Sequence, residues 1–550
     1  MNTHPDWWRG AVIYQVYPRS FCDSNADGIG DLKGITEKLG YVASLGVDAV
    51  WISPIFTSPM KDFGYDVSDY RNVDPMFGSL KDFDDLVERA HQLGLKVMID
   101  QVMSHTSDQH PWFMESRQDQ TNPKRDWYVW VDPQADGSVP NNWLSVFGGS
   151  AWKWDGRRKQ YYLHNFLAEQ PDLNFHNPEV QQEVLSAVEF WLQRGVDGFR
   201  FDTANYFHHD LQLRSNPGLH ERLQRDKLPV NLYDIQRHLY DKNRPENLAF
   251  FERLRVLLDQ YGATSVGEVG DTDALQLMVD YTSGKRLHMT YSFGFLNEDA
   301  DADHVRAQVQ AFDAAAQASG GTSWPCWTVG NHDSVRVRTR WGKQHASGAD
   351  HTRMIAAMLS SLRGSVCWYQ GDELSLPEAE LRFEDLRDPP GIAMWPAYKG
   401  RDGCRTPMPW ERGAAHAGFS GGAEVCPWLP VPEAHQALAV DVTEQDPQAA
   451  VHFVREFWQW RNTQPAMVSG EASYPEANAK VMVVVRRASG AQAWLVACNM
   501  SNAPQRVDAG SWPAGQSKAW ATLPAHQVGQ RDGDVLVLPP CGIYVAAIEE

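Results

Sequence analysis

The 550-residue sequence has few cysteines, no long apolar run and no excess of positive charge. Its seven cysteines form no Cys-x-x-Cys pair, so neither a disulfide scaffold nor a cysteine-based zinc site is predicted. No stretch approaches the roughly 20 apolar residues of a membrane-spanning helix. The first residues, Met1–Arg9, lack the apolar segment of a secretory signal. These features predict a cytoplasmic protein in a reducing compartment.

The formal net charge of −20 argues against a nucleic-acid partner, because phosphates would be repelled. Hydrophobic residues make up 43% and charged residues 22%, a balance that is typical of a folded chain with a core. The length predicts two to four domains of about 100–200 residues each. The 22 Trp, 18 Tyr and 22 Phe residues suit either stacking on sugar rings or the filling of large cores, and composition leaves both open.

Short apolar runs alternate with amphipathic segments through the first two-thirds of the chain, as in parallel βαβ units. Eight such units would close a (β/α)8 TIM barrel whose active site lies at the carboxyl ends of the strands. The competing doubly wound sheet would carry a Gly-rich phosphate fingerprint, which is missing. Amphipathic segments include Leu80–Leu93 and Pro178–Arg194, and the predicted strands are Ala11–Tyr17, Val47–Ser53, Lys96–Val102, Val196–Asp202, Thr264–Val269, His288–Phe293, Trp327–Asn331 and Ser365–Gln370.

Two segments depart from this alternation. Residues 105–175, rich in Trp, Asp, Gly and Pro, are too long for a simple loop and predict a subdomain inserted after the third strand. From residue 471 onward, Val481–Arg486, Trp494–Asn499 and Gly533–Leu538 read as strands separated by turn residues. We therefore expect an α/β protein with a barrel formed by residues 1–104 and 176–470, the inserted subdomain, and a C-terminal antiparallel β-sandwich-like domain over 471–550.

Charged residues lie at the ends of several predicted strands, where an unpaired buried charge would be costly. A single residue of this kind would most often belong to a structural ion pair. Acidic residues at the ends of four separate strands converge on one face of a barrel and instead favour a functional site. The candidate residues are Asp100, His105, Arg200, Asp202, Glu268, His332 and Asp333.

Hydrolysis of a glycoside with retention of configuration requires such a set: a carboxylate nucleophile and a protonated carboxylic acid about 5–5.5 Å apart. Arg200 precedes Asp202 by two residues and shares its strand face, so we expect Arg200 to keep Asp202 ionised. Glu268 lies in the apolar segment SVGEVG, which we expect to raise its pKa toward acid/base duty. Asp333 supplies a third carboxylate.

At these positions the sequence resembles the α-amylase superfamily of glycoside hydrolases, and in particular its α-glucosidase and oligo-1,6-glucosidase branch. The resemblance implies that Asp202 is the nucleophile, Glu268 the general acid/base and Asp333 the carboxylate that stabilises the transition state. It places His105 and His332, whose rings can donate hydrogen bonds to hydroxyls, at the transferred sugar. The matching motifs are VDGFRFDTAN (196–205), GNHD (330–333), DQVMSH (100–105), QPDLN (170–174), DFGYD (62–66), RDGCRTPMPW (401–410) and YQGDE (369–373).

Further site residues follow from the same resemblance. It implies that Asp62 binds the non-reducing-end glucose, that Tyr65 stacks on it and that Arg401 contacts it. Thr203 directly follows the nucleophile, where Thr or Ala goes with α-1,4 activity and Val with α-1,6 activity in this branch. Phe147, Phe166 and Trp154 are candidates for stacking around the substrate, although each could instead pack inside the inserted subdomain.

Ser104 stands where many α-amylases have a calcium-binding Asn, so the amylase-type calcium site at the insertion is not expected here. A different loop, Asp23–Asp31, spaces oxygen ligands at alternate residues around a glycine, as Ca²⁺ loops do. An EF-hand would need Glu where Gly34 stands, and an ion-free Asx-rich turn is the alternative. The resemblance implies a structural Ca²⁺, or Mg²⁺ in its place; the predicted ligands are Asp23, Asn25, Asp27, the Ile29 carbonyl and Asp31.

The sequence therefore predicts a retaining, exo-acting α-glucosidase for maltose-like disaccharides, short oligosaccharides and aryl α-glucosides, with α-1,4 bonds favoured and glucosyl transfer through a glucosyl-Asp202 intermediate. The alternatives are a sucrose hydrolase or a sucrose-isomerising transglucosidase. A non-catalytic, transporter-associated homologue would carry a membrane span, and none is predicted. The polar segment 206–248 is expected to act as a lid or to be a surface insertion. We expect a monomer or homodimer with a small α-glucoside as its only partner.

Overall fold

Eight parallel strands form the centre of the fold in the computed structural model. They are hydrogen-bonded in the order β11-β10-β9-β5-β2-β1-β13-β12, and a parallel bridge between Thr290 and Pro325 closes the sheet into a barrel. The structure describes residues 6–219, 229–271, 273–298, 301–343, 345, 347–422 and 424–549. The barrel strands are β1 (Val12–Val16), β2 (Ala49–Ile52), β5 (Lys96–Gln101), β9 (Gly198–Phe201), β10 (Thr264–Val269), β11 (Met289–Ser292), β12 (Cys326–Thr328) and β13 (Ser365–Tyr369).

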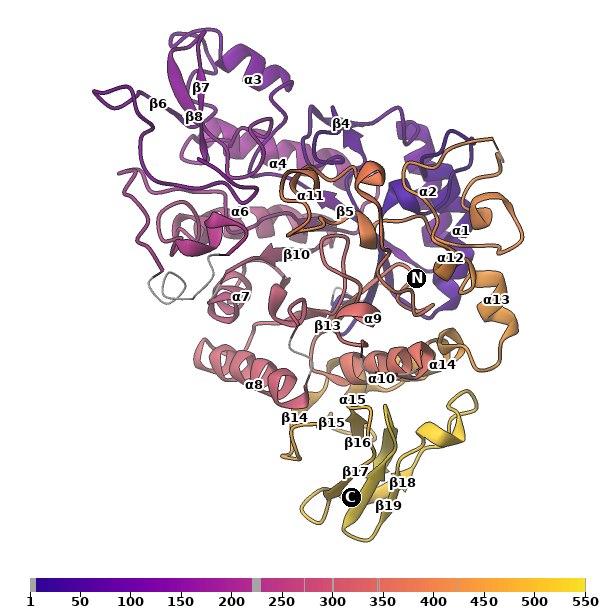
Figure 1. Ribbon diagram of the computed structural model, residues 1–550. Coiled ribbons are helices and arrows are strands. Elements are labelled where there is room, and N and C mark those ends of the chain that lie inside the picture. Colours follow the sequence, from indigo (N-terminus) through magenta and orange to yellow (C-terminus); the bar gives the residue numbers. More distant parts are fainter. Residues whose placement is uncertain are drawn as a thin grey trace.

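Helices surround this barrel (Figure 1) and confirm the predicted (β/α)8 architecture. The sequence supplies side-chain caps for several of them; for example, Ser79 caps α2 in a capping box, and Asn177 caps α4, which has Pro at its first position. The surrounding helices are α1 (Leu32–Ser44), α2 (Leu80–Gln92), α4 (Pro178–Leu192), α6 (Glu246–Tyr261), α7 (Ala274–Thr282), α8 (Ala302–Ala318), α10 (Gly348–Ser361) and α14 (Ala450–Asn462).

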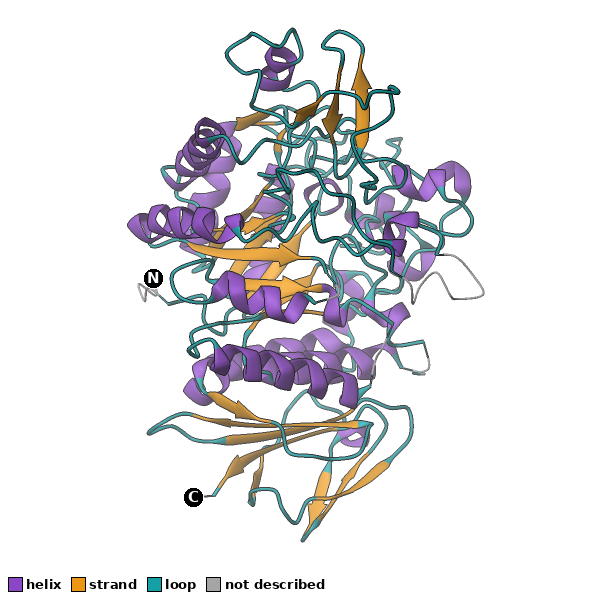
Figure 2. Cartoon of the chain, turned by 90° about the vertical axis from the view of Figure 1, so that its left-hand side faces the viewer, coloured by secondary structure: helices purple, strands orange, loops and turns teal. Residues whose placement is uncertain are grey.

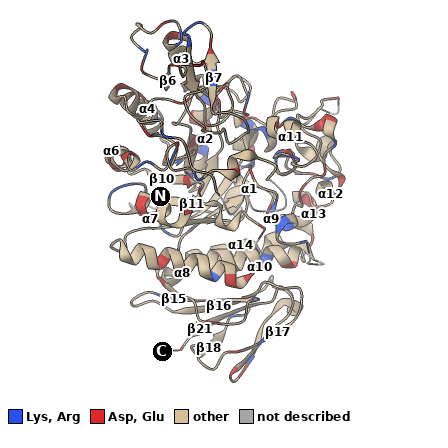
Figure 3. Cartoon of the chain, turned by 60° about the vertical axis from the view of Figure 1, so that its left-hand side comes forward, with Lys and Arg blue, Asp and Glu red and all other residues tan. Residues whose placement is uncertain are grey.

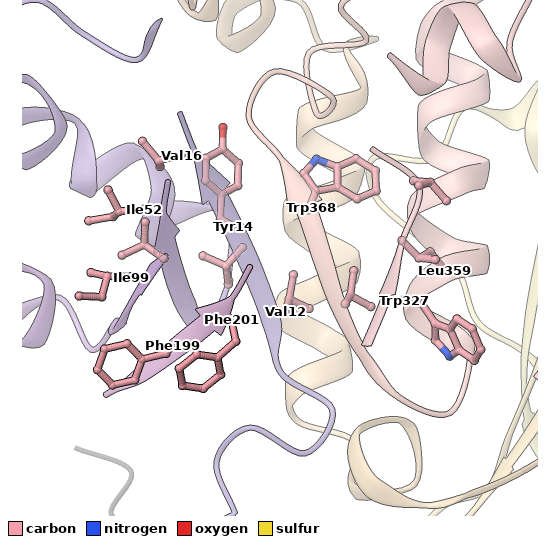
Figure 4. Packing of buried hydrophobic residues seen from close by; sticks show 14 of the residues in the cluster. Val12, Tyr14, Val16, Ile52, Ile99, Phe199, Phe201, Trp327, Leu359 and Trp368 are labelled. Atoms are coloured by element: carbon pink, nitrogen blue, oxygen red, sulfur yellow. The ribbon is translucent and has the colours of Figure 1, made fainter. Parts of the chain in front are cut away.

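Alternate residues of each barrel strand face opposite sides, which divides the core into two layers. Val12, Tyr14 and Val16 of β1 belong to the large cluster between the barrel and the helices, part of which is shown in Figure 4. Ile13 belongs to a separate cluster inside the barrel. Burying one such aliphatic side chain contributes about 1.5–3 kcal/mol. The inward-facing positions near the carboxyl ends of the strands are polar, and these form the site described below.

The predicted inserted segment carries a small antiparallel sheet, seen at the top of Figure 1. An isolated bridge between His105 and Asp172 ties the start of this segment to its end. Its elements are α3 (Pro111–Ser116), β6 (Trp130–Val131), β7 (Trp152–Asp155) and β8 (Gln160–Leu163), and a short ribbon of β3 (Phe56–Thr57) and β4 (Asp69–Val73) lies beside the barrel.

Two antiparallel sheets follow the last barrel helix, as predicted for the C-terminal part of the chain. They lie at the end of the molecule opposite the inserted segment (Figure 2), and β15 and β16 contact α8 and α10. One sheet has the order β14-β15-β16-β21-β18 and the other β17-β20-β19. The strands are β14 (Glu471–Ser473), β15 (Val481–Arg487), β16 (Trp494–Asn499), β17 (Gln505–Asp508), β18 (Gly515–Ser517), β19 (Gln530–Asp532), β20 (Val535–Leu538) and β21 (Ile543–Ile548).

The barrel strands match the predicted ranges with small differences at their ends. Strand β9 stops at Phe201, one residue short of the prediction, because Thr203 has a φ of 44° and cannot continue a strand. Strand β12 stops at Thr328, so Asp333 lies in the loop that follows it. The remaining short helices are α9 (Val337–Arg340), α11 (Pro389–Ala393), α12 (Glu433–Gln436), α13 (Val440–Gln445) and α15 (Pro465–Ser469).

Acidic and basic residues are interspersed along the outer helices and loops (Figure 3), so the net charge of −20 is not confined to one element. Within the part of the chain that the structure describes, every helix is too short or too polar to cross a membrane. All seven cysteines belong to this part and are free thiols, six of them buried.

Candidate active site

A cavity of about 200 Å³ lies at the carboxyl ends of the barrel strands. This volume is below the roughly 300–1,000 Å³ of pockets for drug-sized ligands, and therefore suits one small polar ring with part of a second group. The cavity is lined by Asp62, Tyr65, His105, Val146, Phe147, Phe166, Gln170, Asp202, Thr203, Asn205, Tyr206, Glu268, Gly270, Phe293, Asp333 and Arg401.

Arg200 connects the carboxylates beneath this cavity. Because β9 turns Phe199 and Phe201 toward the helices, Arg200 faces the barrel interior, where it is fully buried. One terminal nitrogen, Nη1, lies 2.6 Å from Asp202 Oδ1 and 2.8 Å from Asp100 Oδ1. The other, Nη2, lies 2.7 Å from Glu268 Oε2. A single planar guanidinium therefore holds Asp202 and Glu268 side by side.

Burial controls the ionisation of both carboxyl groups. It raises the pKa of Asp202 to about 7, with Arg200 opposing the shift. It also raises the pKa of Glu268 to about 7, as the apolar strand context predicts. The prediction that Arg200 would keep Asp202 ionised is wrong, because the removal of water around Asp202 outweighs its contact with Arg200, which Asp100 and Glu268 also share.

Asp333 has the opposite environment. Its Oδ1 accepts hydrogen bonds from Arg405 Nη2 at 2.7 Å and Arg401 Nη1 at 3.2 Å, and its Oδ2 lies 3.2 Å from His332 Nε2. Burial alone would raise the pKa of Asp333, but these neighbouring groups hold it well below the usual range. Asp333 is therefore the carboxylate of the site that stays ionised at neutral pH.

Asp62 and Arg401 form an ion pair across the cavity wall, with 2.8 Å between Asp62 Oδ1 and Arg401 Nη2. Arg401 also donates to Asp388 Oδ1 at 2.7 Å, and Gln170 Nε2 donates to Asp62 Oδ2 at 3.2 Å. The pair joins residues separated by 339 positions in the sequence, so it ties two distant loops together at the barrel mouth.

Tyr65 lines the cavity, and its ring stacks on His332 with 5.4 Å between centroids and an angle of 2°. The Tyr65 hydroxyl lies 2.6 Å from His332 Nε2 and donates to Asp100 Oδ2 at 3.0 Å. His332 is fully buried and, like Arg200, lies behind the cavity surface instead of lining it. His332 and Arg200 therefore contact the residues that line the cavity and do not line it themselves.

The aromatic candidates of the inserted segment separate into two groups. Phe147 lies over Arg401 with 5.2 Å from the guanidinium to the ring centre, and Phe166 packs against Phe147 and His105. Both line the cavity. Trp154 does not: it is 42% exposed on β7 and packs edge-on against Tyr161. Of the two roles considered for Trp154, the structure therefore favours packing within the inserted segment over stacking around the cavity.

Several lining residues were not predicted as site residues, among them Gln170, Tyr206 and Phe293. Gln170 lies inside the QPDLN motif and Tyr206 directly follows the nucleophile motif. Their positions next to these motifs could therefore have indicated that both residues belong to the site. Phe293 ends a predicted strand and had no distinguishing neighbour. Arg405 belongs to the quoted RDGCR segment, but its contact with Asp333 depends on a loop path that the sequence does not specify.

The segment 206–248 packs beside the cavity where the structure describes it. Tyr206 lines the cavity, and its hydroxyl lies 2.8 Å from that of Tyr233. Lys242 Nζ donates to the carbonyl of Gly270, another lining residue, at 2.9 Å. Residues 220–228 of the segment lie outside the described residues, and its action as a lid stays a prediction.

The loop Asp23–Asp31 precedes α1 and has oxygen donors only, the chemistry that Ca²⁺ and Mg²⁺ prefer. Asp23 accepts backbone N–H groups of the loop, Asp27 Oδ1 accepts from Ile29, and Asp31 caps α1. Among the described residues, no three His, Cys, Asp or Glu side chains converge as a ready ligand set. The donor set fits a hard cation, and the hydrogen bonds are also those of an Asx-rich turn.

A closed parallel barrel with Asp202, Glu268 and Asp333 at the mouth of one small cavity defines the class of the protein, a glycoside hydrolase. Residues 15–470 match the family described as "Alpha amylase, catalytic domain". The chain therefore belongs to the α-amylase family.

Individual relatives support this assignment over nearly the whole chain. A protein of Rhizobium meliloti (strain 1021) named "Probable alpha-glucosidase" is 54% identical over 486 residues, covering 88% of this chain and 87% of its own. The crystal structure of an α-glucosyl transfer enzyme is 53% identical and superposes with a TM-score of 0.92 over 99% of both chains. The trehalulose synthase of Pseudomonas mesoacidophila MX-45 is 31% identical, with a TM-score of 0.87 over 99% of both chains.

Proposed function

We propose that the protein is a retaining α-glucosidase that removes a single terminal glucose and also transfers it. The observation that carries this proposal is the pair of carboxyl groups held by the two nitrogens of Arg200, at 2.6 Å from Asp202 and 2.7 Å from Glu268. Both carboxyl groups contact the same guanidinium and line the same cavity, which supports attack on a sugar carbon by one group and proton donation by the other. The name of the 54% identical relative supports the same activity.

In the first step, a side-chain oxygen of Asp202 attacks C1 of the glucose, and the bond to the leaving oxygen breaks as Glu268 delivers its proton to that oxygen. In the second step, Glu268 removes a proton from water, whose oxygen attacks C1 and releases Asp202. A sugar or alcohol hydroxyl in place of water gives glucosyl transfer. Asp333 stays ionised and stabilises the positive charge that develops on the sugar ring.

The small cavity supports exo action. A volume of about 200 Å³ suits one sugar ring, and the Asp62–Arg401 pair offers a carboxylate and a guanidinium to the hydroxyls of a terminal glucose. Phe147 and Phe166 add apolar surface to the cavity wall, and Phe147 lies directly over Arg401 of this pair.

The pH profile follows from the two raised pKa values. Asp202 must be ionised to attack and Glu268 must be protonated to assist, and burial places both pKa values near 7. We expect kcat/KM for an aryl α-glucoside to fall below neutral pH as Asp202 gains a proton and above neutral pH as Glu268 loses one. The profile from pH 5 to 9 checks this, and a flat profile or an optimum near pH 5 would contradict it.

Rates on maltose, isomaltose and sucrose test the substrate assignment. Thr203 lines the cavity directly after Asp202 and supports α-1,4 over α-1,6 bonds, so we expect kcat/KM for maltose to exceed that for isomaltose at least about 10-fold, as one well-placed contact can achieve. Sucrose hydrolysis or isomerisation is the second candidate, favoured by the 31% identical trehalulose synthase. Faster turnover of sucrose than of maltose, with isomers of sucrose as products, would replace the first candidate with the second.

We further propose that the loop Asp23–Asp31 binds a structural Ca²⁺, or Mg²⁺ in its place. Bound Ca²⁺ stabilises the folded chain by mass action, so we expect millimolar Ca²⁺ to raise the Tm by several degrees and a chelator to lower it. The D27N variant, altered at an exposed loop position, should lose this response while keeping its activity on saturating substrate. Equal Tm values with Ca²⁺ and with chelator would favour the ion-free turn.

We also propose a cytoplasmic location and a monomeric or homodimeric state, with small α-glucosides as the substrates. The seven free thiols, six of them buried, support a reducing compartment. Sedimentation velocity at micromolar concentration distinguishes the two oligomeric states, because a dimer would have twice the monomer mass of 62.1 kDa.

A further inference from the structure

Ser104 lies between two residues of the cavity wall without reaching the cavity itself. It is 1% exposed and follows strand β5. Its Oγ lies 2.8 Å from His105 Nδ1 and 2.8 Å from Thr203 Oγ1. Both of these neighbours line the cavity, whereas Ser104 does not. Any effect of Ser104 on a bound sugar must therefore pass through His105 or Thr203.

The tautomer of His105 follows from its partners. Burial lowers the pKa of His105 to about 4, so the ring is neutral and carries one proton. Its Nε2 lies 3.0 Å from the Tyr65 carbonyl oxygen, which can only accept, and the proton therefore belongs on Nε2. The Gln170 side-chain nitrogen is 3.2 Å from the same ring nitrogen, but it has an acceptor of its own in Asp62.

This tautomer gives the hydrogen-bond chain a direction. Because Nδ1 of His105 is left as an acceptor, the Ser104 hydroxyl must donate to it. Ser104 has a single hydroxyl proton, so it accepts the hydrogen bond from the Thr203 hydroxyl. One serine thus orders two wall residues, which lie in the segments that follow two different barrel strands, β5 and β9.

Thr203 is the residue that links this chain to the reaction. It is β-branched and has a φ of 44°, a strained conformation that persists only where its surroundings fix it. In this conformation its backbone N–H donates to Glu268 Oε2 at 3.2 Å. The hydrogen bond from the Thr203 side chain to Ser104 is one of the contacts that hold it there.

We propose that Ser104 is a positioning residue for the acid/base group: its hydroxyl holds Thr203 in the conformation that directs the Thr203 N–H at Glu268. The inference rests on the proposed function and deepens it, since it assigns a role to the residue that replaces an Asn of many α-amylases.

The S104A variant tests this role with an aryl α-glucoside, whose turnover does not depend on linkage. Removal of the hydroxyl leaves His105 Nδ1 and the Thr203 hydroxyl without their buried partner, and we expect kcat to fall about 10-fold with a smaller change in KM. S265A is the matched control. Ser265 is also fully buried in a barrel strand and bonded to a histidine ring, that of His288, but it lies outside the cavity, so its kcat should not change.

The position of the alkaline limb of the pH profile provides a second measurement. A residue that only stabilised the fold would not shift this limb when it is replaced. The Thr203 N–H lowers the pKa of Glu268 by stabilising its ionised form, so loosening Thr203 in S104A should shift this limb to higher pH. S265A should leave the limb in place. The other charged or titratable groups that face Glu268 are expected to keep their positions in both variants; they are Arg200, Asp202, Tyr291, Asp333 and Asp100.

A double-mutant cycle separates this role from a general loss of packing. T203V removes the hydroxyl that donates to Ser104, so the S104A/T203V double variant should be no slower than the slower of the two single variants. The S104T variant keeps a hydroxyl at position 104 and should recover most of the kcat that S104A loses. Additive losses, or an S104A variant within twofold of wild type with an unshifted alkaline limb, would overturn the proposal. Wild-type protein without turnover of any α-glucoside would instead overturn the proposed function.

Discussion

D202N is expected to lose activity on every α-glucoside by on the order of 10⁴-fold while remaining folded. The amide cannot form the glucosyl ester, so the covalent step is lost and not merely slowed. Burial raises the pKa of Asp202 to about 7, which means that the folded state disfavours the ionised carboxylate at higher pH. Replacement by a neutral amide removes this cost, so the Tm of D202N at pH 8 should equal or exceed that of wild type.

D48N is the matched control for this variant. Burial also raises the pKa of Asp48, to about 6, but Asp48 accepts the N–H of Val12 at the opposite end of the barrel strands. Its substitution should leave kcat/KM within about twofold of wild type, as expected for a residue remote from the site. A D202N preparation with more than about 1% of wild-type activity would remove Asp202 from the nucleophile position.

The E268Q variant is expected to lose activity to a different extent on substrates with different leaving groups. Glutamine cannot donate a proton, so hydrolysis of maltose should fall about 10²–10⁴-fold, the range that general acid catalysis contributes. An aryl α-glucoside with an acidic phenol needs little protonation and should still form the glucosyl ester, which then accumulates because no base activates water. Added azide should attack C1 of that ester and release α-glucosyl azide, detectable by NMR.

The pH profile of E268Q provides a second readout, because the alkaline limb assigned to Glu268 should disappear. E378Q serves as the control: burial raises the pKa of Glu378 to about 7 as well, yet this residue does not line the cavity and binds the N–H of Arg336. Equal losses on maltose and on the aryl glucoside would show that Glu268 does not act as the acid.

The barrel itself could be predicted because its signals are local. Runs such as VIYQV and TSVGEV are short, apolar and bounded by turns, and strand β10 occupies the predicted range Thr264–Val269. The carboxylates could be placed at the mouth because the carboxyl ends of parallel barrel strands share one face. The location of Asp202, Glu268 and Asp333 at the mouth therefore followed from their positions relative to the strands, whereas the role of each came from the resemblance to the α-amylase superfamily.

The other contacts of the site depend on the paths of loops that are distant in the sequence and on how deeply each group is buried. Neither property can be recognised from a short stretch of sequence. The Asp388 carboxylate that holds Arg401, and the Arg405 contact with Asp333, arise because the loops after β13 fold back over the mouth. The ionisation of Asp202 was predicted wrongly because spacing reveals the neighbouring Arg200 but not the loss of water around both groups. The sequence also left open whether Trp154 stacks at the cavity or packs within the inserted segment, since composition does not give the position of a side chain.

The anomeric form of the first glucose released is the most direct test of a covalent mechanism at Asp202. Proton NMR of a maltose digest, recorded in the first minutes before the released sugar equilibrates, distinguishes the two anomers. Two successive displacements at C1 predict that α-glucose appears first and that the β-anomer grows in only with mutarotation. Initial release of β-glucose would mean a single displacement by water and would contradict the assignment of Asp202.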